Sequence, residues 1–138
     1  MPAVGSAPSP ALLHQLRTLA ARTHPREAVA LVLCSPRRCI AVPLRNLADD
    51  PQRHFQVEPL EFARIEHALR RRGFQVLALF HSHPVGPARP SPADRAAAWS
   101  GLETWIGAPT SAGFELGRFD ARGRPLSPAT FVPMRDPL

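Results

Sequence analysis

The 138-residue sequence contains no lysine and no tyrosine, so all 17 of its basic residues are arginine. A GC-rich genome accounts for this pair of absences. Cysteine is scarce as well: Cys34 and Cys39 are too few for a disulfide framework, and their spacing is not the CxxC of metal and redox motifs. They flank residues 35–38, where we expect a hairpin loop. We predict that both remain free thiols and bind no zinc.

The sequence also lacks a secretion signal and any long hydrophobic run. Residues 1–10 are rich in proline, serine and alanine, and no long apolar stretch follows a basic one. No segment approaches the roughly 18 apolar residues that a membrane span requires. We therefore expect a cytoplasmic protein with no membrane partner, in which residues 1–9 are flexible.

The length and the charge set the broad class of the protein. A chain of 138 residues, 44% of them hydrophobic, is enough for a single domain with one core, which we assign to residues 1–138. The formal net charge of +6 suggests an acidic partner, either a nucleic acid or a small acidic protein. The densest basic run, 70–72, falls at the end of a predicted helix, where the helix dipole favours cations.

Apolar periodicity predicts alternating helices and strands. The helical spacing of apolar residues predicts amphipathic helices at 10–22 and 58–72. Short apolar or alternating runs between turn residues predict strands. We expect these strands at 28–34, 38–44, 54–57, 74–80, 102–107, 113–120 and 130–132, and a third helix at 92–100. The fold class is therefore α/β, with a mixed, curved β-sheet flanked by helices.

The most informative stretch is HSHPVGPARPSPAD, residues 81–94. His81 and His83 are two apart at the end of an apolar run, so on a strand both imidazoles point to the same side. Ser91 is a good N-cap for a helix that includes Asp94, and the loop before it can bring Asp94 back toward the histidines. Two imidazoles and a carboxylate, with a fourth position left for water, predict a catalytic zinc site.

One acidic residue from the first half of the chain fits the same chemistry. Glu27 comes directly before the apolar run 28–34. An acid at a strand start is usually exposed and without function. Zinc, however, lowers the pKa of water toward about 7, and a nearby carboxylate can take the proton and pass it to a leaving amine. We assign no role to the remaining histidines, His14, His24, His54 and His67.

Together these residues resemble the JAMM (MPN-plus) metallopeptidase motif, E…H-[ST]-H-P-x6-S-x2-D. Two longer stretches are also similar to the small bacterial members. PREAVALVLC (25–34) looks like their first strand, and PLRNLADDPQRHFQVEP (43–59) looks like the segment between their hairpin and second helix. The resemblance covers residues 25–99. It implies the JAMM/MPN fold, whose α/β sheet is similar to that of the cytidine deaminases.

The resemblance also implies roles for the motif residues. His81, His83 and Asp94 would bind one Zn²⁺. Glu27 would be the general base for the water that the ion activates, and Ser91 would donate a hydrogen bond to the oxyanion. The implied activity is a zinc-dependent peptidase or isopeptidase that cleaves after the C-terminal Gly-Gly of a ubiquitin-like or sulfur-carrier protein. The leaving group (a cysteine, an extension peptide or a lysine conjugate) stays open, as does the oligomeric state.

Two alternative functions have different sequence signatures. RadC-like proteins, linked to DNA repair, carry a similar H-x-H-P motif with asparagine in the middle and Pro-Ser-Gly after it. Ser82 and the sequence Pro-Val-Gly at 84–86 favour the peptidase here, so we do not expect a nucleic-acid partner. DNA binding with a steep salt dependence would favour RadC. A non-catalytic MPN scaffold would have lost ligands, whereas all five motif residues are present.

Overall fold

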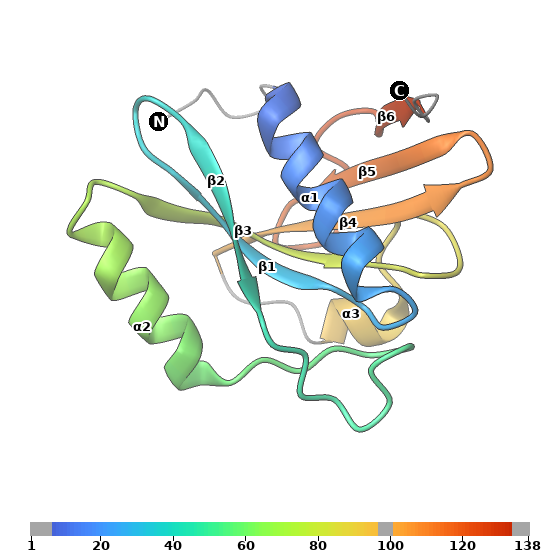
Figure 1. Cartoon of the computed structure of the whole chain (residues 1–138), viewed down its shortest axis with the longest axis horizontal. Coiled ribbons are helices and arrows are strands. Elements are labelled where there is room, and N and C mark those ends of the chain that lie inside the picture. The colour runs from blue at the N-terminus through green and yellow to red at the C-terminus, as the bar shows by residue number, and fades with distance from the viewer. Residues whose placement is uncertain (1–6, 97–100, 134–138) are drawn as a thin grey trace.

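The computed structural model describes residues 7–96 and 101–133 and builds them around one six-stranded sheet (Figure 1). The helices are α1 (Pro10–Thr23), α2 (Pro59–Arg70) and α3 (Pro92–Ala96). The strands are β1 (Val29–Cys34), β2 (Cys39–Leu44), β3 (Gln75–Ser82), β4 (Glu103–Thr110), β5 (Gly113–Phe119) and β6 (Thr130–Pro133). Their order is β2-β1-β3-β4-β5-β6, and β3 and β4 are parallel while the other pairs are antiparallel. The sheet is therefore mixed, as predicted.

Strand β1 is buried on both faces because α1 and α2 pack on opposite sides of the sheet (Figure 1). Its even-numbered side chains, such as Ala30 and Val32, join the cluster that contains Leu16 of α1. Its odd-numbered side chains join a second cluster beneath α2. Two-sided burial explains why this segment reads as an unbroken apolar run rather than an alternating one.

The helices begin as their sequences predict. The Ser9 hydroxyl accepts a hydrogen bond from the Leu12 amide at 3.2 Å, and α1 has a proline in its first turn. The Glu58 carboxylate accepts from the Leu60 amide at 3.2 Å and caps α2 in the same way. Among the residues that the model describes, no helix has the length and apolar composition needed to cross a membrane.

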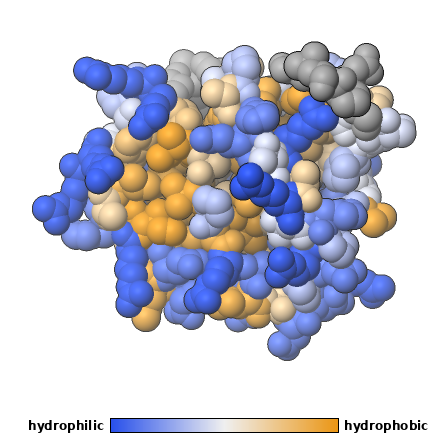
Figure 2. Space-filling view, in the orientation of Figure 1, coloured by the Kyte–Doolittle hydropathy of each residue, from blue (hydrophilic) through white to orange (hydrophobic). Residues whose placement is uncertain are grey.

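The edge strand β2 exposes apolar side chains but few free backbone donors. Figure 2 shows an apolar area on the face that β2 occupies in Figure 1. The Ala41 amide donates to the Gln15 Oε1 atom of α1 at 3.2 Å, and the Arg45 amide donates to the Glu61 Oε1 atom of α2 at 3.1 Å. Pro43, between them, has no amide hydrogen. These three positions disfavour the addition of another strand at this edge.

The predicted strand at 54–57 is wrong: the segment is part of a loop. The alternation that suggested a strand is real, because Val57 is 8% exposed and Phe55 packs against the same cluster while their neighbours are exposed. The backbone of this segment, however, forms hydrogen bonds with the side chain of Asn46 and does not pair with a neighbouring strand. The Asn46 amide group accepts from the Gln56 amide at 3.2 Å and donates to the His54 carbonyl at 2.9 Å. Exposed and buried side chains therefore alternate along residues 54–57 although the segment belongs to no β-ladder.

The prediction of free thiols is also wrong, because Cys34 and Cys39 form a disulfide. They lie directly opposite each other in the β1–β2 register, at the end of the hairpin. The cysteine count could not reveal this pairing, since it depends on the register. Residues 1–6 of the expected flexible segment and 97–100 of the third predicted helix lie outside the described residues.

Candidate active site

The candidate site lies at the carboxyl end of β3, where β1 and β4 flank this strand on either side. His81 is 1% exposed and is paired in register with Val29 of β1 and Ile106 of β4. His83 follows the strand and continues its pairing, because its amide donates to the Gly107 carbonyl at 2.8 Å. The two imidazoles therefore project from a segment that is paired with strands on both of its sides.

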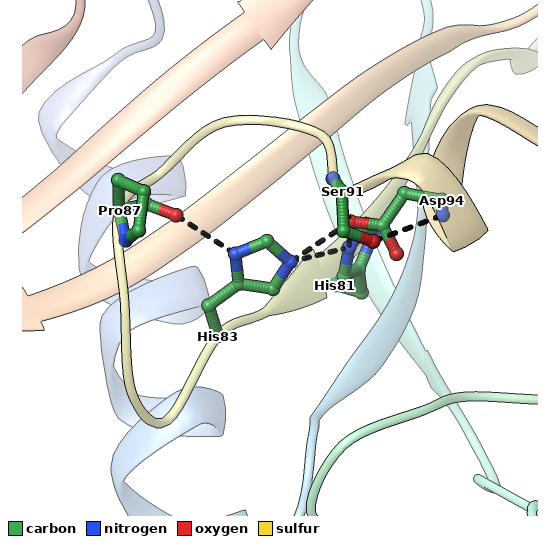
Figure 3. A network of polar contacts seen from close by, with 5 residues as sticks. All are labelled: His81, His83, Pro87, Ser91 and Asp94. Carbon is green, nitrogen blue, oxygen red and sulfur yellow. Dashed lines mark hydrogen bonds and ion pairs between the residues drawn. The ribbon is translucent and has the colours of Figure 1, made fainter.

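Three ligand atoms form a small triangle at this point (Figure 3). The two Nε2 atoms of His81 and His83 are 3.2 Å apart, and the Asp94 Oδ2 atom lies 3.2 Å from the first and 2.9 Å from the second. Tetrahedral zinc with bonds of about 2.0–2.1 Å to nitrogen and oxygen requires ligand atoms about 3.3 Å apart. The triangle has almost these dimensions, so the three side chains fit a single ion without rearrangement.

The ring of His83 is held in the form that a metal ligand needs. Its Nδ1 atom lies 2.8 Å from the Pro87 carbonyl oxygen, which can only accept (Figure 3). Nδ1 therefore carries the hydrogen, and Nε2, the ring atom that faces Asp94, can bind a metal ion once it has lost its own proton. The Nδ1 atom of His81 has no hydrogen-bond partner among the described residues. Instead, the His81 ring packs against Phe55, with the ring centroids 4.5 Å apart.

Helix α3 places Asp94 through a reciprocal cap with Ser91. The Asp94 amide donates to the Ser91 Oγ atom at 3.1 Å, and the Ser91 amide donates to Asp94 Oδ2 at 2.9 Å (Figure 3). The serine oxygen acts here as an acceptor, which leaves its own hydrogen available to a second group. Capping the helix and donating to a substrate are therefore compatible in this geometry.

Glu27 lies just before β1 and is 3% exposed, in contrast to the usual acid at a strand start. Ligand atoms of Glu27, His81 and His83 all lie within 4.8 Å of one another. The Glu27 Oε1 atom has no hydrogen-bond partner among the described residues. The structure thus brings the five motif residues together from the segments at the start of β1, the end of β3 and the start of α3, and among them Glu27, His81 and His83 form a group that could hold a metal ion.

The two acids of the site have opposite electrostatic environments. Burial raises the pKa of Glu27 to about 7. Burial acts in the same direction on Asp94, but hydrogen bonds with His81 and His83 outweigh it and hold the Asp94 pKa well below its usual range. Burial lowers the pKa of His81. At neutral pH, Asp94 is therefore an anion suited to a cation, while Glu27 can both take up and release a proton.

A cleft of about 900 Å³ opens over this group. Glu27 and Ser91 line it, and so do three arginines, Arg53, Arg89 and Arg95. Glu27 is the only acid among its lining residues, so basic side chains outnumber acidic ones along the cleft. A second, largely apolar cavity of about 390 Å³ adjoins it, since His24 and Pro84 line both.

Sequence reasoning assigned no role to three residues that contact this group: Ser82, Asn46 and Phe55. The Ser82 hydroxyl, which is buried, accepts a hydrogen bond from the Ala28 amide at 2.8 Å and so ties the end of β3 to the residue after Glu27. The position of Ser82 between the two histidines was a signal that the sequence offered. Asn46 is the only asparagine of the chain, but this fact by itself predicted no role.

The fold and the site define a JAB/MPN domain. The chain belongs to the family described as prokaryotic homologs of the JAB domain, whose model matches residues 9–119. This match includes every residue of the candidate site.

Two curated relatives are each similar to somewhat less than two thirds of the chain. A protein of Thermus thermophilus named "Probable TtuB-protein conjugate cleaving protease" is 39% identical over 85 residues, which are 60% of this chain and 56% of the relative. "Tail tip assembly protein K" of Escherichia phage N15 is 34% identical over 86 residues, 62% of this chain and 33% of the relative. The chain thus spans about half, or less, of the length of these relatives.

Solved structures with the same fold cover most of the chain. A solution structure from Desulfitobacterium hafniense is 25% identical, with a TM-score of 0.68 over 91% of this chain and 88% of the other. A crystal structure of a JAB1/MPN domain protein from Archaeoglobus fulgidus has a TM-score of 0.56 at 21% identity, over 84% and 90% of the two chains. These likenesses confirm the predicted α/β fold.

Proposed function

We propose that this protein is a zinc-dependent peptidase or isopeptidase that cleaves after the C-terminal Gly-Gly of a ubiquitin-like or sulfur-carrier protein. The observation that carries the proposal is the triangle formed by His81, His83 and Asp94, with sides of 2.9–3.2 Å and the acid Glu27 beside it. The Thermus thermophilus relative, named for cleaving TtuB–protein conjugates, supports this class of substrate.

In the proposed mechanism each residue has a separate task. His81, His83 and Asp94 hold the ion. A bound zinc ion supplies Lewis-acid polarisation of a carbonyl and lowers the pKa of water to about 7. Glu27 accepts a proton from water in the cleft and returns it to the leaving amine, for which a pKa near neutrality is well matched.

Ser91 stabilises the negative charge that develops on the substrate. Its hydroxyl hydrogen is free to donate to the carbonyl oxygen while its oxygen keeps the cap of α3. Helix α3 therefore positions both a metal ligand and an oxyanion donor. The cleft beside them is open enough for an extended tail, and glycines have no side chains that would clash with its sides.

The basic side chains of the cleft predict an acidic carrier. Arg53, Arg89 and Arg95 surround the point of entry, and all three are exposed. Charges in a cleft raise the local concentration of an oppositely charged partner and steer its approach. The Arg-rich composition of the chain is consistent with a partner of this kind.

The direct test is cleavage of a carrier that is extended past its diglycine. We expect the zinc-loaded protein to release the carrier with a free Gly-Gly end, detected by its intact mass. Prior chelation should remove the activity, and added Zn²⁺ should restore it. A control carrier that ends in Ala-Ala before the extension should not be cut. Cleavage that is unaffected by chelation would contradict the zinc mechanism, and failure on conjugated and linear carriers alike would contradict the substrate class.

Replacing Ser91 by alanine should separate its two roles. Loss of an oxyanion donor costs about 100- to 1,000-fold in kcat, whereas loss of a helix cap costs about 1 kcal/mol of stability. We expect Ser91→Ala to show both effects when kcat and the free energy of unfolding are measured. Ser9→Ala, which removes only the cap of α1, is the matched control. Equal kcat values for the two variants would rule out oxyanion stabilisation by Ser91.

A further inference from the structure

The loop at residues 46–57, here called the Asn46 loop, takes its shape from one side chain. The Asn46 amide nitrogen donates to three carbonyl oxygens, those of Glu27 at 3.1 Å, Pro51 at 3.3 Å and His54 at 2.9 Å. Its oxygen accepts from the amides of Ala48 at 3.1 Å and Gln56 at 3.2 Å. Removing this side chain would take away these bonds and leave the loop only its backbone hydrogen bonds, such as those from Leu47 to Gln56 and from His54 to Asp50.

The same side chain fixes the backbone of Glu27. The Glu27 amide donates to the Pro51 carbonyl of the loop at 2.7 Å, and the Glu27 carbonyl accepts from Asn46. Both backbone polar groups of Glu27 are therefore bonded to the Asn46 loop. The Glu27 carboxylate itself has an oxygen with no hydrogen-bond partner among the described residues. Its position over the histidines thus depends on the backbone to which it is attached.

The far end of the loop contacts the other side of the site. Phe55 lies against the ring of His81, with a centroid distance of 4.5 Å and an interplanar angle of 30°. His83 has a hydrogen bond from Nδ1 to a carbonyl, but the corresponding nitrogen of His81 has no partner among the described residues. Packing by Phe55 replaces the hydrogen bond that usually orients a ligand histidine.

We propose that Asn46 and Phe55 are positioning residues of this site: Asn46 places the Glu27 carboxylate through its backbone, and Phe55 orients the His81 ring. The loop lies outside the H-S-H-P-x6-S-x2-D segment, and Gln52 and Arg53 within it line the substrate cleft. A single loop therefore joins the base, one metal-binding imidazole and the side of the cleft. The test of Asn46 measures peptide cleavage and so rests on the proposed function. The test of Phe55 measures Zn²⁺ affinity and does not.

Asn46→Ala should lower kcat by about 10- to 100-fold, the usual effect of residues that orient a catalytic group. The KM and the Zn²⁺ dissociation constant should change by a smaller factor than kcat, because the loop reaches the metal site only through Phe55 and the cleft only through Gln52 and Arg53. Gln15→Ala is the matched control, since Gln15 also binds a backbone amide but lies at the β2 edge. Activities are compared at a temperature at which circular dichroism shows every variant folded.

Asn46→Asp separates the bonds that Asn46 donates from those that it accepts. An aspartate keeps the two bonds accepted from Ala48 and Gln56 but cannot donate to the carbonyls of Glu27, Pro51 and His54. We expect its kcat to be as low as that of Asn46→Ala. Recovery to the wild-type kcat, or an Asn46→Ala kcat equal to that of Gln15→Ala, would overturn the role of Asn46.

Phe55→Ala should weaken Zn²⁺ binding by about 10- to 100-fold in competition with a chromophoric chelator, without any substrate present. Phe55→Leu, which keeps most of the apolar contact, should recover most of the affinity. Ile65→Ala is the control, because Ile65 packs in the same cluster from α2. Equal Zn²⁺ affinities for Phe55→Ala and Ile65→Ala would overturn the role of Phe55. If the wild type cleaves no carrier, the proposed function fails, yet this measurement still decides the inference for Phe55.

Discussion

Glu27→Gln should abolish peptide hydrolysis while the protein continues to bind zinc. The substitution keeps the size of the side chain but removes its ability to take up a proton, and general acid–base groups contribute about 100- to 10,000-fold to rate. Because the proposed mechanism has Glu27 both accept the proton and return it, we expect the loss to lie near the upper limit. The measurement is the single-turnover rate on a carrier extended past Gly-Gly, beside the Zn²⁺ dissociation constant.

Glu58→Gln is the matched control for this variant. Glu58 is an exposed acid that caps α2 and lies outside the group formed by Glu27 and the histidines. Its replacement should leave the rate within about twofold of the wild type, since surface substitutions have small effects. A Glu27→Gln protein that cuts as fast as Glu58→Gln would show that Glu27 is not the base. Loss of zinc from Glu27→Gln would instead make Glu27 a ligand.

The metal-free protein gives a second readout on Glu27 that needs no substrate. Its pKa is raised from 4.5 to about 7 by burial, so the folded state holds the proton more tightly than the unfolded chain. Stability is therefore lost as the pH rises from about 4.5 through 7. Glu27→Gln removes this loss and should be more stable than the wild type by at most about 3 kcal/mol at pH 8, but not at pH 4. Parallel pH profiles in urea unfolding would contradict the buried, unpaired carboxylate.

Asp94→Asn should release the metal and, with it, the activity. Asp94 Oδ2 lies within 3.2 Å of both imidazole Nε2 atoms, and an amide cannot supply its negative charge. Mutation of residues that only support the metal ligands lowers metal affinity by about 10- to 100-fold. We therefore expect removal of the charge of a ligand itself to lower Zn²⁺ affinity by more than about 100-fold. The Zn²⁺ dissociation constant is measured by chelator competition, and cleavage of the carrier is measured in the same preparations.

Asp120→Asn provides the control for Asp94→Asn. Asp120 also accepts backbone amides, those of Arg122 and Arg124 at 2.9 Å, and its pKa is lowered by these bonds, first of all the one involving Arg124. It lies in the turn after β5, and its replacement should leave Zn²⁺ affinity unchanged. Asp94→Asn could also weaken the cap with Ser91, so unfolding curves of both variants are compared. Retention of wild-type Zn²⁺ affinity by a folded Asp94→Asn protein would contradict the assigned ligand set.

The elements around the site could be predicted from local patterns. The apolar run that ends in His81 and His83 predicted a strand, and β3 extends through Ser82. The Ser-Pro-x-Asp sequence predicted the start of α3 at Pro92. Both predictions rest on interactions between residues close in sequence, namely strand alternation and helix capping, which a single sequence displays directly.

Three predictions were wrong or incomplete because they depend on contacts between residues far apart in the sequence. The alternation at 54–57 marked the correct buried side chains but not the loop, because Asn46 takes the backbone bonds that a strand would need. The cysteines were counted but not paired, because pairing follows from the β1–β2 register. An acid at the start of a strand, such as Glu27, is usually exposed and without function, and only the predicted zinc site indicated a role for it. In the structure Glu27 is 3% exposed, and its backbone is hydrogen-bonded to a loop that begins 19 residues later.

By itself, the sequence determined the family, the order of most elements and the identity of the five motif residues, because spacing and residue type carry this information along the chain. Only the tertiary structure decided how close the ligand atoms come, that Glu27 is buried beside them, and that Asn46 and Phe55 support the site from outside the motif. These properties arise between segments separated by 19 to 54 residues, such as Asn46 with Glu27 and Ala28 with Ser82. Contacts of this kind leave no local pattern, since any side chain of suitable shape at either position could make them.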